Sequence, residues 1–449
     1  MSGNKCLNTA TARTGWRNLS RKAESEGLFD LASVLPIFPC EVTCYKIGLR
    51  RYQDLSVEQH TKPGTLNMVL LGMVQILCWG GSFYLLAVMA APVAKETGWS
   101  LQWIYGALSA GILVSGLLAP LCGRIIACSG GRLMLALSGI VMACGLVMMG
   151  FSHTLTLFLL AWVIIGTGMA MGLYDALFAV LGTLYGGQAR GAITGITLIS
   201  GFCTTLVWPG TALLIHWLDW RGACFAIAAL LVVTVPPACF YALPAPQREL
   251  QKRSPLRQSR PTSLPPRLFW LLCAIFTLAS VIMTAISVQL ITLLQSSGYS
   301  LAAALAISAI PGPCQVGSRV VDMAFKRGHP IWTTFFSVGL VAIGLLILAL
   351  FPHMALLSMI LYGAGNGLRA IVRGTLPLAL VRPEEYAIVA GKMARPALTG
   401  QALTPLAGGY IFDIAGPSAM LWLLCLLAVI NVLLVAMLKK SMSIPSTVS

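Results

Sequence analysis

Seven ionisable residues lie inside long apolar stretches of the 449-residue sequence, where a charge exposed to lipid would cost at least about 2.5 kcal/mol. They comprise five bases and two acids: Arg319, Arg369, Arg373, Lys392, Arg395, Asp175 and Asp322. A guanidinium can hold a carboxylate through two parallel hydrogen bonds, and a buried carboxyl group can bind and release a proton. The excess of bases predicts a cavity that favours a small anion.

Arg369 and Arg373 are four residues apart and therefore share one face of a helix. We expect Arg369, near the middle of its apolar stretch, to pair the anion, with Asn366 three residues earlier on nearly the same face. Arg373 is a second candidate, but a structural ion pair or a side chain extended to the interface is an equal alternative. Gln401 and Tyr84 are further candidates, although such groups more often bond another helix.

Asp175 has no base nearby in its own predicted helix and is placed for a cycle of protonation and release, because burial favours its neutral form. The alternative is a fixed ion pair with a base of another helix. Arg319 and Asp322, three residues apart, favour a salt bridge at a gate. Lys392 and Arg395 lie close enough to the end of their stretch to reach the interface.

The composition excludes a water-soluble fold. Apolar residues make up 57% of the chain and charged residues 10%, against roughly 25% charged in soluble domains. Most of the 13 cysteines fall in apolar stretches, where a cysteine behaves as a small hydrophobe, and they predict neither disulfides nor a metal site. The net charge of +16 sits beside apolar stretches, so we expect no nucleic-acid partner, and the sequence indicates no cofactor.

The elements that must position these charges are membrane-spanning helices, since each needs about 20 mainly apolar residues. The sequence predicts an all-α membrane protein with twelve transmembrane helices in two pseudo-symmetric halves of six. The predicted spans are 67–94, 101–122, 133–151, 155–181, 192–217, 222–243, 268–294, 301–323, 331–351, 355–381, 386–412 and 417–438.

The spans divide the chain into five parts. A polar, poorly ordered tail is predicted over 1–65, the first half over 66–243, a basic linker over 244–267, the second half over 268–438 and a short tail over 439–449. An alternative for the first tail is a natural start at Met68. Fourteen bases fall in the loops and tail on the linker side and two on the other side, which predicts that both termini and the linker are cytoplasmic.

Glycine, proline and aspartate positions repeat between the halves at offsets close to 195 residues. The repeated positions include Gly168 and Gly172 with Gly363 and Gly367, Gly195 and Pro209 with Gly391 and Pro405, and Asp219 and Gly222 with Asp413 and Gly416. Related halves around a central site are typical of transporters.

The loop after the second span resembles the GxLaDrxGrR signature of the major facilitator superfamily, with Gly123, Gly130 and Arg132 matching. Ala127 stands at the signature's acidic position. The resemblance covers the chain from about residue 66 to 440 and implies the fold of that superfamily, with this loop, including Arg124, acting in gating.

The subfamily is indicated by residues beyond the signature. The segment Ala161–Tyr174 lacks the arginine of the drug/proton antiporters. Trp208-Pro209 and Trp220-Arg221-Gly222 are similar to bacterial members of the monocarboxylate and oxalate/formate-like branch. We also expect Trp208 and Pro209 to mark a bend in the fifth span beside the cavity.

The expected function is secondary active transport of a small organic anion by alternating access in symport with protons, in a monomer of a bacterial plasma (inner) membrane. Efflux of a toxic compound or metalloid oxyanion is one alternative, and a membrane sensor that transports nothing is another. An enzyme is not favoured, because no nucleophile, histidine and acid are grouped in the sequence.

Overall fold

The computed structural model of the protein describes residues 64–244, 264–325 and 328–442. Nearly all of the predicted tail 1–65, most of the linker 244–267 and most of the tail 439–449 lie outside the described residues. The described chain is built from α-helices and two short 3-10 helices, and it contains no strand.

The helices follow one another with short connections. Their bounds are α3 Thr65–Gly80, α4 Leu86–Thr97, α5 Leu101–Ser129, α6 Arg132–Gly150, α7 Leu155–Gly172, α8 Tyr174–Tyr185, η2 Gly186–Gln188, α9 Ala189–Ser200, α10 Cys203–Ala242, α12 Pro266–Ser296, α13 Leu301–Ala309, α14 Pro311–Phe325, α15 Pro330–Leu350, η4 Pro352–Met354, α16 Ala355–Leu380 and α17 Pro383–Met442.

Eight helical stretches of the described chain are long and apolar enough to cross a membrane. One of them runs for 88 residues from Leu155 to Ala242, several times the length of one crossing, so it holds more than one pass. From the 60-residue helix α17, the stretch Ile414–Met442 is one of the eight. The all-α membrane fold predicted from the sequence is confirmed, and the helix order is consistent with twelve passes.

The two longest helices each turn at one residue with positive φ. In α10 this residue is Asp219 (φ 59°), whose carboxylate oxygen accepts hydrogen bonds from the backbone N–H groups of Arg221 at 2.7 Å and Gly222 at 2.9 Å. In α17 it is Gly416 (φ 80°), for which a glycine is the natural choice. The turn of α17 that matches Asp219 is therefore at Gly416. The repeat found in the sequence matched Asp219 with Asp413, three residues earlier.

Several passes of the described chain are broken. The fifth pass breaks at Gly201 and Phe202, between α9 and α10, while the bend expected at Trp208-Pro209 stays a prediction. Pro209 lies inside α10, where Asp219 alone has a non-helical backbone. A proline can be kept in a membrane helix because neighbouring groups satisfy the carbonyl that it leaves free.

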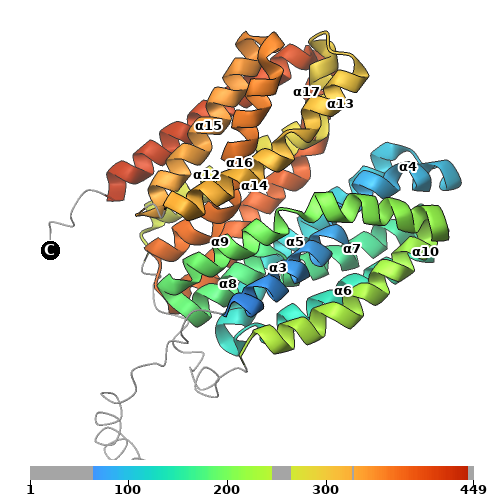
Figure 1. Cartoon of the computed structure of the whole chain (residues 1–449), viewed down its shortest axis with the longest axis horizontal. Helices are drawn as coiled ribbons and strands as arrows, with labels where there is room; N and C mark the ends of the chain where they lie inside the picture. The colour runs from blue at the N-terminus through green and yellow to red at the C-terminus, as the bar shows by residue number, and fades with distance from the viewer. Residues whose placement is uncertain (1–63, 245–263, 326–327, 443–449) are drawn as a thin grey trace, which may run out of the picture. The chain divides into compact units, whose positions relative to one another are not determined.

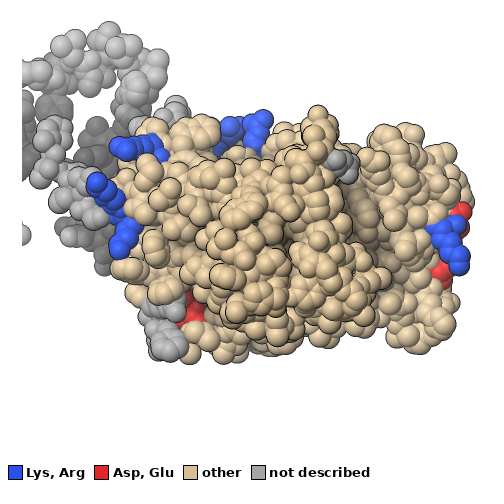
Figure 2. Space-filling model, turned by 90° about the horizontal axis from the view of Figure 1, so that it is seen from above, with Lys and Arg blue, Asp and Glu red and all other residues tan. Residues whose placement is uncertain are grey.

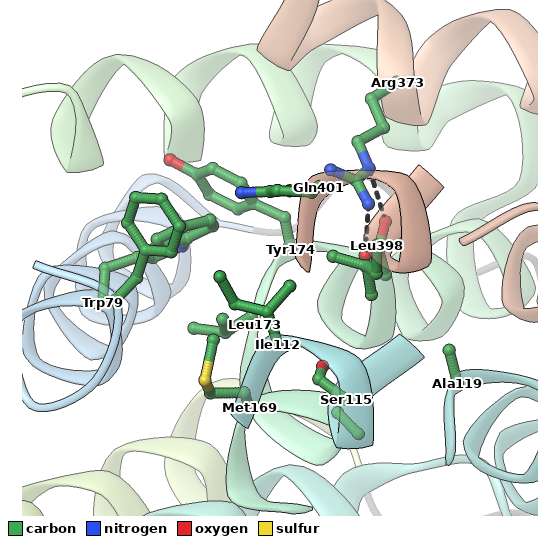
Figure 3. A pocket seen from close by; sticks show the side chains of 13 residues that line it. Trp79, Ile112, Ser115, Ala119, Met169, Leu173, Tyr174, Arg373, Leu398 and Gln401 are labelled. Carbon is green, nitrogen blue, oxygen red and sulfur yellow. Dashed lines mark hydrogen bonds and ion pairs between the residues drawn. The ribbon is translucent and has the colours of Figure 1, made fainter. Parts of the chain in front are cut away.

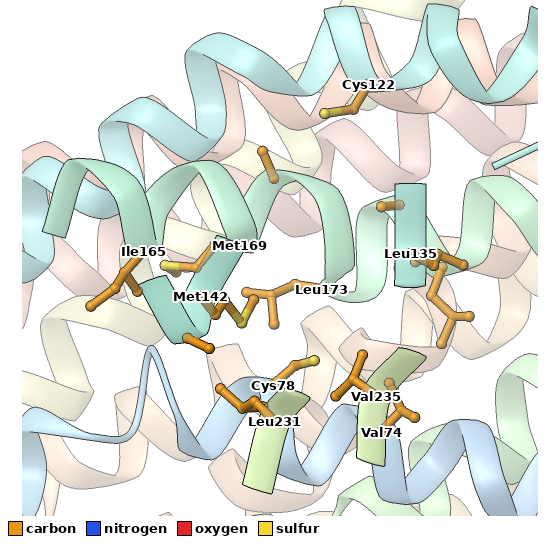
Figure 4. Packing of buried hydrophobic residues seen from close by; sticks show 14 of the residues in the cluster. Val74, Cys78, Cys122, Leu135, Met142, Ile165, Met169, Leu173, Leu231 and Val235 are labelled. Carbon is orange, nitrogen blue, oxygen red and sulfur yellow. The ribbon is translucent and has the colours of Figure 1, made fainter. Parts of the chain in front are cut away.

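The helices form two groups, which we call the N-terminal half (α3–α10) and the C-terminal half (α12–α17). Figure 1 shows the blue-to-green helices of the first and the yellow-to-red helices of the second. Each half has its own apolar packing. Figure 4 shows part of that of the N-terminal half, where the buried thiol of Cys78 lies beside Leu231. Seven of the ten described cysteines are buried, as hydrophobic side chains would be.

The halves meet at the end of the bundle where α10 ends and α12 begins, which we call the linker end. There α5 and α17 approach so closely that a Cβ on Gly123 would lie 2.4 Å from the carbonyl oxygen of Ala387. A Cβ on Gly391 would lie 2.6 Å from the carbonyl oxygen of Ala119. Toward the opposite, far end, Gly106 of α5 and Gly409 of α17 would meet nothing within 4 Å. The halves are therefore in close contact at the linker end, and Figure 1 shows α4 and α13 away from each other at the far end.

Charged groups gather at the ends of the helices. At the far end, Glu96 pairs with Arg221 at 2.9 Å and accepts a hydrogen bond from the indole N–H of Trp220. Arg221 also donates to the carbonyls of Gly150 and Ser152. On the face shown in Figure 2, the charged side chains lie toward the two ends, with an uncharged region between them. This distribution suits a protein whose middle lies in lipid.

We predict that Gly391→Ala destabilises the protein and that Gly409→Ala, in the same helix, does not. The first change inserts a methyl group against backbone and should cost about 1–3 kcal/mol, whereas the second fills open space and should stabilise by roughly 0.5–1 kcal/mol. Thermal melting of the purified proteins in detergent measures both. Equal melting temperatures for the two variants would contradict the close approach of α5 and α17.

Candidate functional site

A break in the fourth pass sets the position of Asp175. Helix α7 ends at Gly172, Leu173 is extended with ψ −177°, and α8 begins at Tyr174. The side-chain nitrogen of Gln75 in α3 donates to the carbonyl of Gly172 at 2.8 Å and so satisfies backbone that the break exposes. Asp175 therefore lies in the first turn of α8, where the helix dipole stabilises a carboxylate.

Asp175 forms an ion pair with Arg373 of α16 across the two halves. The guanidinium Nε lies 2.7 Å from Oδ1, and Nη2 donates to Oδ2 at 2.7 Å, so the contact is bidentate. The side chain of Asp175 is 24% exposed and that of Arg373 is 14% exposed, so both charges are largely desolvated. This arrangement matches the ion-pair alternative for both residues, with a partner 198 positions away that the sequence did not identify.

Arg369, one turn earlier in α16, differs from Arg373 in its hydrogen-bond partners. Its Nε donates to Oδ1 of Asn366 at 2.8 Å, and no acidic side chain of the described chain pairs with it. It is half-buried, and Arg319, Arg373 and Tyr84 lie close enough to interact with it electrostatically. The local environment of Arg369 is therefore cationic.

Arg369 and Asn366 line a pocket within the C-terminal half, formed by α12, α15, α16 and α17, with about 320 Å³ of empty space that includes its opening. The hydroxyl of Tyr362 and the side-chain oxygen of Asn431 are buried at this pocket without a hydrogen-bond partner. Such groups are costly unless something binds to them. The pocket thus surrounds an uncompensated cation with unused polar groups.

A second pocket, which we call the central pocket, lies beside the ion pair and is lined by both halves. It has about 460 Å³ of empty space, including its opening. The N-terminal half contributes Trp79, Phe83, Ile112, Ser115, Ala119, Met169, Ala170, Leu173, Tyr174 and Asp175, and the C-terminal half Arg373, Leu398 and Gln401. Figure 3 shows Gln401 between Tyr174 on one side and the Arg373 ion pair on the other.

The sequence analysis did not single out the aromatic residues of this pocket. The rings of Trp79 and Tyr174 lie 5.1 Å apart, and Trp79 also contacts Phe83 at 5.4 Å and Tyr84 at 5.8 Å between ring centroids. Tyr84, a predicted site residue, thus lies in an aromatic cluster. The sequence does contain a sign of this cluster, the pair Gly80-Gly81 next to Trp79. Two adjacent glycines favour a helix end, and α3 indeed ends there before the chain turns into α4.

Arg319 and Asp322 do not form the predicted salt bridge. Arg319 donates to the carbonyl of Gly367 at 3.2 Å and, across the halves, to that of Thr197 at 2.5 Å. Asp322 instead accepts a hydrogen bond from the hydroxyl of Thr333 in α15 at 3.0 Å. Both side chains are buried, and their polar groups form hydrogen bonds with different helices. Arg319 still joins the two halves, through backbone acceptors.

The remaining basic candidates lie away from the central pocket. Lys392 and Arg395 are exposed on α17, as expected for side chains that reach the interface. Trp208 is 43% exposed and contacts Tyr84, with their ring centroids 6.5 Å apart, at the edge of the aromatic cluster.

The loop after α5 and the residues beside it end one helix and connect others. Gly130 has φ 80° and ends α5, while Gly123 lies in the close contact with α17 described above. Arg132 donates to the carbonyl of Phe240 and lies over its ring, at 5.0 Å from the centroid, which ties α6 to the end of α10. Arg124 is exposed.

Comparison with solved structures finds this fold in known transporters. The human organic anion transporter MFSD10 (TETRAN) superposes with a TM-score of 0.66 at 17% identity, covering 83% of this chain and 100% of the other. FucP, a Major Facilitator Superfamily transporter in the outward conformation, gives 0.63 at 14% identity, covering 83% and 98%. A single-residue variant of the E. coli fucose:proton symporter FucP gives 0.62 at 15% identity, covering 83% and 98%.

At the sequence level, no curated protein matches this chain. The sequence model described as Major Facilitator Superfamily matches residues 71–394, which is well over half of the chain. Members of that family are transporters and not enzymes, in keeping with the all-helical fold and a pocket lined by both halves. The protein belongs to the Major Facilitator Superfamily.

Proposed function

We propose that this protein carries a small organic anion, of the monocarboxylate type, by alternating access of its two halves. The observation that carries the proposal is Arg369, a half-buried guanidinium in the middle of α16 that has no acidic partner in the described chain. A cation in such a place is unfavourable until an anion binds beside it. The similarity to an organic anion transporter is in keeping with this substrate class.

The groups around Arg369 suit a carboxylate. Asn366 holds Nε, so the two terminal nitrogens of the guanidinium are left for a ligand. The hydroxyl of Tyr362 has no partner and can donate to the same anion. A charge-assisted pair of this kind is roughly twice as strong as a neutral hydrogen bond, and it fixes the orientation of the ligand.

We further propose that Asp175 carries the coupling proton. Its side chain lines the central pocket and is 24% exposed, so a proton from the pocket can reach it. Protonation removes the negative charge that holds Arg373, which loosens one of the contacts between the halves and leaves Arg373 available to the anion. Arg373 and Gln401 then complete the binding site, and anion and proton move in the same direction.

In this proposal the protein is a monomer in the plasma (inner) membrane of a bacterium, with the linker end and both termini facing the cytoplasm. The contact of Gly123 with α17 then closes the cytoplasmic side, and the pocket opens outward. The similarity to FucP in its outward conformation is in keeping with this assignment. Arg124, Gly130, Arg132, Trp208 and Pro209 would act in gating or support.

Efflux of a toxic compound or a metalloid oxyanion would use the same cationic site and differs in the direction of net movement. A sensor that transports nothing would bind an anion without moving it. Uptake into proteoliposomes over a panel of carboxylates and oxyanions, with and without a pH gradient, separates these functions from the proposed one.

Arg369→Gln should lower anion uptake into proteoliposomes at least about tenfold, equivalent to about 1.4 kcal/mol, because the anion loses its charged partner. Arg395→Gln removes a base from an exposed position of α17 and should leave uptake unchanged. Initial rates with labelled carboxylate at equal protein content provide the measurement. Retained uptake by Arg369→Gln would overturn the assignment of the site.

Asp175→Asn should make uptake insensitive to the pH gradient, while exchange of labelled for unlabelled anion continues, because the amide cannot bind and release a proton. The matched change Asp322→Asn alters the other acid inside the spans, which faces Thr333 and not the pocket, and should keep the response to pH. The test compares initial rates with and without an inward proton gradient. A normal gradient response in Asp175→Asn would remove this residue from the coupling step.

A further inference from the structure

The central pocket is lined by groups that a small carboxylate would not contact. Besides the charged groups Asp175 and Arg373 and the polar side chains of Ser115 and Gln401, its lining is apolar and aromatic. Trp79, Phe83 and Tyr174 lie on the side of the N-terminal half. In Figure 3 the rings of Trp79 and Tyr174 lie on the opposite side of the pocket from the ion pair. The pocket is therefore charged on one side and aromatic on the other.

Two polar side chains at this pocket have no partner. The indole N–H of Trp79 is buried without an acceptor. Gln401 is 5% exposed, and its carboxamide makes no hydrogen bond with any residue of the described chain. An indole nitrogen can only donate, and a carboxamide can do both. A ligand that fills the pocket should therefore present a hydrogen-bond acceptor to Trp79 and Gln401, because unsatisfied buried polar groups are unfavourable.

The aromatic side is held in place before any ligand binds. Trp79 lies at the end of α3 and Tyr174 at the start of α8, so two helix breaks bring their rings together. The hydroxyl groups of Tyr174 and Ser200 form a 2.5 Å hydrogen bond, and Tyr174 stacks on Phe178 with an interplanar angle of 12°. Rigid rings lose little conformational entropy on binding and favour another flat, apolar group over a flexible one.

We propose that the central pocket binds an arene carboxylate, with the ring against Trp79 and Tyr174 and a polar substituent of the ring at Trp79 and Gln401. The carboxylate points toward Arg373, which protonation of Asp175 makes available. This assignment rests on the proposed function, because it takes for granted that the transported solute is an organic anion. Short aliphatic carboxylates share the charged group but present little surface to the aromatic side. The pocket thus discriminates by the body of the anion as well as by its charge.

The test uses binding of labelled 4-hydroxybenzoate to the purified full-length protein, with benzoate, cyclohexanecarboxylate and acetate as competitors. Benzoate and cyclohexanecarboxylate have equal charge and carbon number and differ in planarity. We expect benzoate to compete at least fivefold better than cyclohexanecarboxylate, 4-hydroxybenzoate to compete better than benzoate, and acetate to compete least. Equal competition by the flat and the puckered ring would overturn the proposal.

Variants separate the ring from its N–H group. Trp79→Phe keeps a ring, so it should retain benzoate binding and lose the advantage of the hydroxyl group. Trp79→Leu should weaken benzoate at least tenfold and leave acetate unchanged. Trp270→Leu removes a tryptophan that is 66% exposed on α12 and should change nothing. If Trp79→Phe keeps the full hydroxyl advantage, the acceptor contact is wrong, and if Trp79→Leu weakens every anion alike, the ring contact is wrong.

The outcome also distinguishes this proposal from the proposed function. If the wild-type protein neither binds nor transports any carboxylate, the proposed function fails and this proposal fails with it. If it transports acetate or lactate in an Arg369-dependent manner without preferring arene carboxylates, the proposed function stands and only the arene assignment is wrong. Melting temperatures of the variants, measured without ligand, show that each one is folded.

Discussion

The ion pair between Arg373 and Asp175 is the contact on which the rest of the site depends, because it joins the two halves through largely desolvated charges. Its geometry requires Asp175 at the start of α8, which requires the break after Gly172. The break is tolerated because Gln75 supplies a hydrogen bond to the freed carbonyl, and lipid could not. One charged contact thus constrains the packing of α3, α7, α8 and α16.

The two arginines of α16 differ in a way that matters energetically. Arg373 has its counter-charge within the protein, and breaking that pair would leave a buried charge without compensation. Arg369 shares the helix face and has only the neutral Asn366. The fold therefore pairs one cation with a carboxylate and leaves the next one without an acidic partner in the described chain. A second anion near Arg373 competes with Asp175, whereas an anion near Arg369 competes with nothing in the described chain.

Much of the architecture could be predicted from the sequence because hydropathy alone determines where a chain can cross lipid. The charged members of the site could be found as well, since an ionisable residue inside an apolar stretch is rare. Their partners could not: Asp175 and Arg373 are 198 positions apart, and only the folded chain brings them together.

The predicted pair of Arg319 and Asp322 is wrong because neighbours on a helix can turn toward different helices. The helix breaks could not be predicted from the sequence either, since Leu173 and Phe202 are ordinary apolar residues. The aromatic side of the central pocket was missed because its rings come together only through such breaks.

Both halves contribute residues to the lining of the central pocket. The N-terminal half supplies the rings and Asp175, and the C-terminal half supplies Arg373 and Gln401. A ligand that touches both sides keeps its full set of contacts only while the halves hold these groups together. It can shift the balance between two arrangements of the halves only by the difference in its contacts between them. In the proposed cycle, a protonated Asp175 and an anion bound to Arg373 would replace the internal pair and keep the pocket neutral, so the halves could part there without exposing an uncompensated charge.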